Sequence, residues 1–126
     1  DDVDVNATAA ALRETQEEIG LTADWIEVLG HLPEYVTGTS FTVTPVVALV
    51  RPGFVLQPNP HEVDDVFEVP LAHLLDERSW RRDSFLREGV RREYWAVPFE
   101  ERYIWGATAG MLRTFREVLL HPGSGA

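Results

Sequence analysis

The chain of 126 residues contains no cysteine, which excludes disulfides, thiol nucleophiles and zinc sites built on cysteine. The same absence fits a cytoplasmic protein, and we expect that location. Basic residues are few, since 11 stand against 21 acidic residues, and the net charge of -10 argues against general binding to nucleic acid. No apolar run approaches the ~20 residues of a membrane span, and no signal peptide is visible, so we expect no membrane partner.

A run of acidic residues near the start of the chain is the strongest feature that is present. Glu14, Glu17 and Glu18 stand at positions i, i+3 and i+4, so a helix places their carboxylates on one face. Like charges in this arrangement repel one another unless a cation lies among them. Mg²⁺ takes carboxylate oxygens and commonly shares its coordination with substrate phosphates. The pattern therefore predicts a site for a divalent cation.

The other positions of this helix separate into a small face and an apolar face. Ala7, Ala10 and Ala11 are predicted beside the carboxylates, where their short side chains leave room for a bulky substrate. The opposite stripe is predicted to pack against the core and consists of Val5, Thr8, Ala9, Leu12 and Ile19. Asp4 or Asn6 is the expected N-cap, and Gly20 the expected C-terminal stop.

The remaining chain alternates predicted strands and helices. Strands are expected over residues 25–32, 41–50, 61–70 and 91–99, helices over 71–76 and 108–120, loops over 33–40 and 51–60, and a turn at 100–101. Pro45 cannot donate to a ladder, so it marks a strand edge or a bulge. Thr108 is the expected cap of the last helix, and His121-Pro122-Gly123 its end. This order predicts an α/β fold in a single domain over residues 1–126.

Residues 13–21 resemble the second half of the Nudix box, Arg-Glu-aliphatic-any-Glu-Glu-any-Gly-aliphatic. Its fixed residues are Arg13, Glu14, Glu17, Glu18 and Gly20. Thr15 departs from the first aliphatic place. In the first half of the box, Val5 stands where the family has Glu, with Asp4 beside it, and the opening Gly would fall before residue 1. The resemblance implies a Nudix α/β/α sandwich with a mixed sheet, and we expect this chain to be an N-terminally incomplete domain.

Three later segments resemble the coenzyme A pyrophosphatase-like branch of the Nudix hydrolases. They are residues 41–47 (FTVTPVV), 62–71 (EVDDVFEVPL) and 103–112 (YIWGATAGML). The resemblance implies hydrolysis of a nucleoside diphosphate derivative with Mg²⁺ or Mn²⁺, namely coenzyme A to 3′,5′-ADP and 4′-phosphopantetheine. Two alternatives stay open, a Nudix enzyme for ADP-ribose or NADH, and a catalytically silent Nudix-fold binding module.

The resemblance also assigns roles to single residues. Glu14 and Glu18 are expected to be metal ligands, and Glu17 is either a third ligand or the base that deprotonates water. Arg13 lies four residues before Glu17, close enough for an ion pair that orients it. Glu100 and Glu101 lie in a predicted loop, where some Nudix enzymes keep a catalytic base.

Other residues support weaker expectations. The histidines have no metal-ligand spacing and are expected at the surface or in turns: His31, His61, His73 and His121. Three aromatic residues could stack on an adenine or belong to the core: Tyr35, Phe41 and Trp105. The one basic patch consists of Arg78, Arg81, Arg82, Arg87, Arg91 and Arg92. It could meet the 3′-phosphate of coenzyme A, or line the interface of a homodimer.

Overall fold

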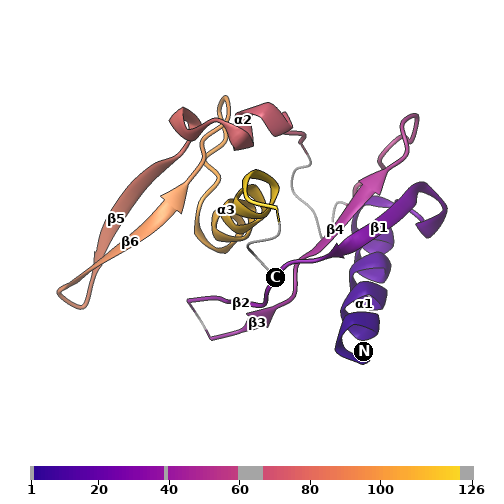
Figure 1. Cartoon of the computed structure of the whole chain (residues 1–126), viewed down its shortest axis with the longest axis horizontal. Coiled ribbons are helices and arrows are strands. Elements are labelled where there is room, and N and C mark those ends of the chain that lie inside the picture. Colours follow the sequence, from indigo (N-terminus) through magenta and orange to yellow (C-terminus); the bar gives the residue numbers. More distant parts are fainter. Residues whose placement is uncertain (1, 39, 60–66, 123–126) are drawn as a thin grey trace. The chain divides into compact units, whose positions relative to one another are not determined.

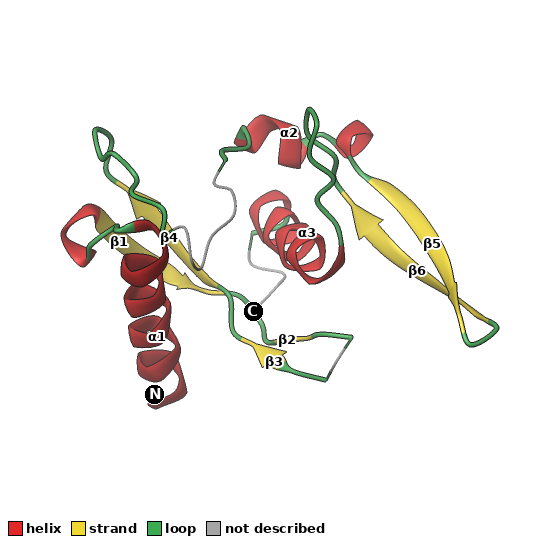
Figure 2. Ribbon diagram, turned by 180° about the vertical axis from the view of Figure 1, so that it is seen from behind, coloured by secondary structure: helices red, strands yellow, loops and turns green. Residues whose placement is uncertain are grey.

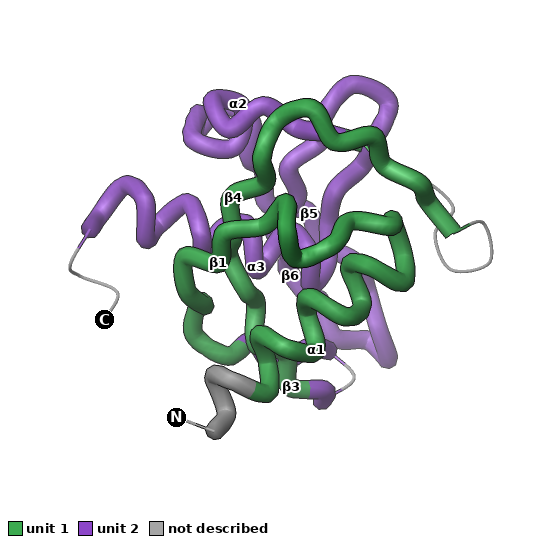
Figure 3. Tube along the Cα trace, turned by 90° about the vertical axis from the view of Figure 1, so that its right-hand side faces the viewer, with its two compact units in different colours: residues 1–34, 42–67 green, residues 35–41, 68–126 purple. Residues whose placement is uncertain are grey.

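The computed structural model describes residues 2–38, 40–59 and 67–122. The chain divides into two compact units, one of residues 1–34 and 42–67 and one of residues 35–41 and 68–126 (Figure 3). Helices accompany antiparallel strand pairs (Figure 2), and the predicted α/β class is confirmed. The single domain expected from the length stays a prediction. Within the described ranges, no helix is long and apolar enough to cross a membrane.

The first unit holds one long helix beside a two-stranded sheet (Figure 1). Its elements are α1 (Asp2–Ile19), the 3-10 turn η1 (Ala23–Trp25), β1 (Ile26–His31), β3 (Thr42–Val43) and β4 (Val46–Val50). Strand β1 pairs with β4 in antiparallel register, with Ile26 opposite Val50 and an irregularity between Val28 and Gly30. The strand predicted over residues 25–32 is therefore confirmed, apart from Trp25, which belongs to η1, and Leu32, which follows the end of β1.

The strand predicted over residues 41–50 is interrupted at Pro45. This residue lacks an N–H, but its carbonyl accepts a hydrogen bond from the Leu32 N–H at 2.9 Å. The β-branched run consequently forms two strands, β3 and β4, as the position of Pro45 indicates. The loop predicted over 51–60 is present over 51–59. Of the strand predicted over 61–70, residues 61–66 lie outside the described residues, and residues 67–70 are not a strand.

The second unit holds a long hairpin and the C-terminal helix. Its elements are β2 (Tyr35–Val36), α2 (Leu71–Leu75), the 3-10 turn η2 (Glu77–Ser79), β5 (Arg81–Arg87), β6 (Val90–Ala96) and α3 (Gly106–Leu120). Both predicted helices are confirmed as α2 and α3. Two expectations are wrong: the predicted loop 33–40 contains β2, and Thr108 lies inside α3. Trp105 is the N-cap of α3 and makes no side-chain cap hydrogen bond.

The hairpin β5–β6 was only half predicted, because the sequence indicated a strand over 91–99 and none before it. The two strands pair in unbroken antiparallel register from Arg81 opposite Ala96 to Arg87 opposite Val90. Glu88 and Gly89 join them with φ of 53° and 78°. Positive φ at both central residues is typical of two-residue hairpin turns. The turn lies at the end of the hairpin away from α2 (Figure 2).

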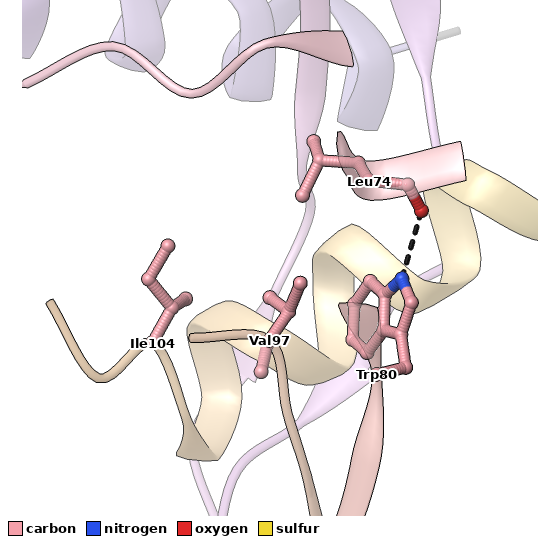
Figure 4. Close-up of a cluster of buried hydrophobic side chains, with 5 residues drawn as sticks. Leu74, Trp80, Val97 and Ile104 are labelled. Atoms are coloured by element: carbon pink, nitrogen blue, oxygen red, sulfur yellow. Dashed lines mark hydrogen bonds between the residues drawn. The ribbon is translucent and has the colours of Figure 1, made fainter. Parts of the chain in front are cut away.

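A small apolar core holds the second unit together. Its buried members are Leu74, Trp80, Val97, Ile104 and Ala109, and Val97 and Ala109 are completely enclosed. The Trp80 indole N–H donates a hydrogen bond of 2.7 Å to the Leu74 carbonyl (Figure 4), which satisfies two polar groups within the core. This bond fixes the end of α2 to the start of β5. The direction in which the hairpin β5–β6 extends from the core is consequently fixed.

Candidate functional site

Helix α1 presents the three predicted carboxylates on its solvent side. Glu14, Glu17 and Glu18 are all exposed. Their spacing on a regular helix places them on one face, as predicted, because 3.6 residues complete a turn. Three hard oxygen donors with this spacing suit a divalent cation chemically. Within the described ranges, no three acidic or histidine side chains are already gathered as a metal centre.

The predicted ion pair between Arg13 and Glu17 is present. The Arg13 Nε lies 3.9 Å from the Glu17 Oε1, and both side chains are more than half exposed, at 66% and 56%. An exposed pair at this distance contributes little to stability, about 0.3–0.5 kcal/mol for i,i+4 pairs on helices. Its effect is therefore to restrict where the Glu17 carboxylate lies rather than to hold the helix together.

The C-terminal turn of α1 is anchored to the loop that follows β4. Gly20 ends the helix with φ of 73°, as predicted, and its N–H donates to the Gln16 carbonyl. The Gln57 N–H donates to the Ile19 carbonyl at 2.9 Å, and the Asn59 N–H donates to the Glu18 carbonyl at 2.7 Å. These bonds satisfy carbonyls that would otherwise lack partners at a helix end. The turn that carries Glu17 and Glu18 is thus fixed from its backbone.

The packed face of α1 differs from the predicted stripe in two residues. Ala9, expected in the stripe, is exposed, whereas Ala11, expected beside the carboxylates, lines an apolar cavity of about 120 Å³ with residues of β1 and β4. The reason is geometric: successive residues of an α-helix are rotated by about 100°, and the side of α1 that packs is centred between Leu12 and Thr15. Asp4 and Asn6, the expected N-caps, lie inside the helix, since α1 begins at Asp2.

Comparison with known proteins decides the family. The model of the NUDIX domain matches residues 2–89. The chain belongs to the Nudix family. It is 38% identical over 113 residues to NudL, an uncharacterised Nudix hydrolase of Escherichia coli, and 37% identical over 113 residues to NudL of Shigella boydii. The match covers 90% of this chain and 59% of either relative, so the chain spans about three fifths of the length of these relatives.

Membership of the Nudix family gives the acidic face of α1 a chemical context. Nudix hydrolases generally need divalent metal ions and act on small-molecule substrates. The residues that match the Nudix box stand on α1 from Arg13 to Glu18, with Gly20 directly after it. Their donor set is all oxygen, which fits a hard cation. Glu14, Glu17 and Glu18 are the residues that would hold it.

Thr15 departs from the Nudix box, and the structure provides a physical account of the change. Its side chain is half-buried and lines the apolar cavity beside Ala11 and Leu12, where the box has an aliphatic residue. The Thr15 hydroxyl donates to the Ala11 carbonyl at 2.7 Å, so no polar group is left unpaired. Threonine can therefore occupy this packing position of the Nudix helix.

Glu100 and Glu101, the alternative base candidates, form a tight turn in the second unit. Phe99 and Arg102 flank them and exchange both backbone hydrogen bonds, each at 2.9 Å. Glu100 has φ of 53°, and both glutamates are exposed. The predicted turn is thus confirmed, while a catalytic role for either residue stays a prediction.

The histidines do not behave alike. His73, expected at the surface or in a turn, is half-buried in α2: its Nε2 lies 2.7 Å from the Pro98 carbonyl, and its Nδ1 lies 3.2 Å from the Ser79 Oγ. The Pro98 carbonyl can only accept, so the Nε2 of His73 is the donor in the first contact. His31 and His121 are exposed, as predicted, and His61 lies outside the described residues.

The three aromatic residues proposed for stacking have different surroundings. Tyr35 is half-buried and its ring lies against Gly110 of α3. Phe41 is 71% exposed, and Trp105 is 52% exposed beside Tyr94, at 5.4 Å between ring centroids. Of the three, Trp105 therefore combines exposure with an aromatic neighbour, whereas Tyr35 belongs to the packing of α3.

The predicted basic patch is divided by ion pairs and by the two faces of the hairpin. Arg78 pairs with Asp76 at 3.0 Å, Arg81 with Asp83 at 2.9 Å, and Arg82 with Glu93 at 3.2 Å. The hydrogen bonds from Arg78 lower the pKa of Asp76. Only the residues nearer the turn, 87, 91 and 92, keep charges that form no ion pair among the described residues.

Sequence reasoning missed a strip of aromatic residues along this hairpin. Phe85 lies 5.8 Å from Tyr94 and Tyr94 5.4 Å from Trp105, measured between ring centroids. The Tyr103 hydroxyl donates to the Asp83 carboxylate, which raises the pKa of Tyr103 to about 12 and lowers the pKa of Asp83. Alternation of Asp83, Phe85 and residue 87 is the signal that could have found this face.

Proposed function

We propose that this protein is a Nudix pyrophosphohydrolase that cleaves coenzyme A to 3′,5′-ADP and 4′-phosphopantetheine with Mg²⁺ or Mn²⁺. The observation that carries the proposal is the exposed carboxylate face of α1 in residues that match the Nudix box. The choice of coenzyme A rests on the similarity of residues 41–47, 62–71 and 103–112 to that branch of the family. The reaction adds water across the diphosphate, so one P–O bond breaks and two phosphomonoesters form.

The proposal assigns a different role to each acidic or basic residue of α1 according to its position. Glu14 and Glu18 lie one helical turn apart and would hold a cation between their carboxylates. A bound divalent cation supplies positive charge that neutralises the diphosphate and increases the acidity of water. Glu17 would act as a third ligand or take the proton from the attacking water. Arg13 touches Glu17 and acts as a positioning residue through it.

The substrate is tested by incubating the protein with Mg²⁺ or Mn²⁺ and each of coenzyme A, ADP-ribose and NADH. Cleavage of coenzyme A with release of 3′,5′-ADP supports the proposal. Preferential cleavage of ADP-ribose or NADH would overturn the choice of substrate while keeping the Nudix chemistry. Absence of all three cleavages would favour a binding module.

Two substitutions test the assignment of metal ligands. Glu14→Gln and Glu18→Gln each remove a charge without changing size, and we expect each to lower kcat by about a hundredfold or more. Glu27→Gln on β1 is the matched control, because Glu27 is an exposed carboxylate of the same unit outside α1. Equal loss in the control, or retained activity in both variants, would contradict the assignment.

The same variants allow a second readout that activity alone does not give. Glu14 repels Glu17 and Glu18 at i,i+3 and i,i+4, and each such pair costs a few tenths of a kcal/mol. In metal-free buffer Glu18→Gln should therefore raise the free energy of unfolding by about 0.2–0.5 kcal/mol while activity falls. Lower stability of the variant would show that Glu18 supports the fold instead.

A further inference from the structure

One face of the hairpin combines positive charge with exposed aromatic surface. Successive residues of a strand alternate between faces, so Phe85 and Arg87 of β5 share a face. Phe85 is opposite Arg92 and Arg87 is opposite Val90, which places all four on that same face. Arg91, although next to Arg92 in sequence, projects to the other face.

These residues line a hollow of about 530 Å³ that Gly38 also borders. Phe85 is 43% exposed and Val90 is 50% exposed, so the apolar part of the lining is open to a ligand. The volume falls within the range of about 300–1,000 Å³ that is typical of small-molecule sites. The hollow is therefore large enough for a nucleotide.

The charges in the hollow favour an anion. Arg87 and Arg92 form no ion pair within the part of the chain that the structure describes, in contrast to Arg81 and Arg82 of β5. The two guanidiniums stand on diagonal positions of the ladder, about 7–8 Å apart at the backbone, from which both can reach one phosphate. The lining also contains two glutamates. Glu93 is paired with Arg82 at 3.2 Å, whereas Glu88 forms no ion pair within the described residues, so the two guanidiniums outnumber the one carboxylate that is not already paired.

The aromatic strip beside these arginines favours a planar group next to the anion. Phe85 lies directly opposite Arg92 and its ring packs against Tyr94, which in turn packs against the exposed Trp105. Asp83 and Tyr103 hold one another by a hydrogen bond at the far end of the strip, where Arg81 is neutralised. Arg81 near the core is thus paired, whereas Arg87 and Arg92 near the turn form no ion pair with any described residue.

We propose that the face of the hairpin formed by Phe85, Arg87 and Arg92 binds a nucleotide, with its base on the Phe85 ring and a phosphomonoester on the two arginines. The proposal rests on the proposed function for the identity of the ligand, since coenzyme A carries an adenine and a 3′-phosphate. The site lies wholly in the second unit and needs no metal ion to bind its ligand.

The test measures binding of adenosine 3′,5′-bisphosphate to the whole chain by titration calorimetry in buffer that contains EDTA. Arg87→Gln and Arg92→Gln should each weaken binding by about tenfold or more, and Phe85→Leu by about tenfold, because phosphate contacts and base stacking are both lost. Arg91→Gln is the matched control, an exposed arginine of the same strand on the opposite face, and should change the affinity by less than about twofold.

Adenosine and inorganic phosphate serve as partial ligands, and each should bind more weakly than the bisphosphate. No binding of the bisphosphate by the wild type, or equal losses in Arg91→Gln and Arg92→Gln, would overturn the proposal. Competition by inorganic phosphate at the same concentration as the bisphosphate would reduce the site to a general anion site. A change in sedimentation of the arginine variants, with nucleotide binding unchanged, would make the face a subunit interface and likewise overturn it.

The outcome is separable from that of the proposed function. Glu18→Gln should abolish hydrolysis and retain binding of the bisphosphate, because the carboxylates of α1 are not in the hollow. If the arginine variants bind the bisphosphate normally while Glu18→Gln is inactive, the nucleotide site is wrong and the hydrolase stands. If Arg92→Gln loses binding and the wild type cleaves none of the three substrates, the reverse holds.

Discussion

Because Tyr35 packs against Gly110, we predict that Gly110→Ala lowers the free energy of unfolding in the wild type and raises it in a variant that lacks the Tyr35 ring. Gly110 lies in α3, and a Cβ placed there would stand 2.7 Å from both the Cε2 and the Cζ of Tyr35. Carbon atoms in ordinary contact are about 3.5–4.0 Å apart, so the ring would have to retreat by about 1 Å. Gly110→Ala therefore combines a gain for the helix with a collision.

The two contributions can be estimated separately. Alanine in place of glycine within a helix stabilises by about 0.8–1 kcal/mol. Overpacking of a well-filled contact costs about 1–3 kcal/mol. Gly110→Ala alone should therefore lower the free energy of unfolding by about 0–2 kcal/mol. In a Tyr35→Ala background the collision is absent, and the same change should raise it by about 0.8–1 kcal/mol.

Urea denaturation of the four proteins of this cycle measures the coupling. The expected interaction is about 1–3 kcal/mol, and effects of glycine on the unfolded chain cancel because both halves of the cycle contain them. The Tyr35 hydroxyl oxygen would be the nearest atom to that Cβ, so Tyr35→Phe should relieve part of the collision and retain the part that is due to Cε2 and Cζ. Equal stabilisation by Gly110→Ala in both backgrounds would refute the contact.

Two further predictions concern the Tyr103 network and the end of α1. Absorbance titration should show one tyrosine ionising at about 12, and Asp83→Asn should return it toward the ordinary value of about 10. Folding raises the pKa of Tyr103, so the stability that this residue contributes is complete below about pH 10 and is lost between about pH 10 and 12. Folding lowers the pKa of Asp83, so the stability that Asp83 contributes is lost as the pH falls below about 4. An unchanged titration in Asp83→Asn would contradict the hydrogen bond. Gly20→Ala should destabilise the protein by about 1–2 kcal/mol because of its positive φ, and by a further amount because the new Cβ would lie 3.2 Å from the Gln57 Cβ. Gly89→Ala is the comparison: its φ is 78° and nothing lies close to it, so only the cost of positive φ is expected. Equal losses of unfolding free energy in the two variants would show that Gln57 does not crowd Gly20.

The sequence predicted those features that depend on local chemistry. Gly20 ends α1 because glycine alone adopts positive φ without cost, and Pro45 divides a strand because it lacks a donor. The acidic face of α1 follows from spacing alone, since any regular helix places positions i, i+3 and i+4 together. These conclusions needed no knowledge of distant contacts.

Features that depend on pairing between distant residues were missed. The run from Arg81 to Arg87 is rich in charge and was interpreted as a patch, yet it forms a strand because β6 supplies its ladder. Asp4, Asn6 and Thr108 have cap chemistry but lie inside helices, because α1 begins at Asp2 and α3 begins at Gly106. The substrate depends on side chains brought together by the fold, so its identity is proposed from resemblance and chemistry.

The turn at Glu88 and Gly89 also determines which chemistry the hairpin displays. Successive residues of a strand face opposite sides of the sheet. If one residue were inserted in this turn and β6 shifted by one position, Arg91 would stand opposite Phe85 in place of Arg92, and the residue before Val90 would stand opposite Arg87. Insertions of one residue at this place would consequently invert the exposed pattern, whereas longer loops that preserve the pairing would leave it intact. Tolerance of the hairpin tip to length variation should therefore depend on whether register survives.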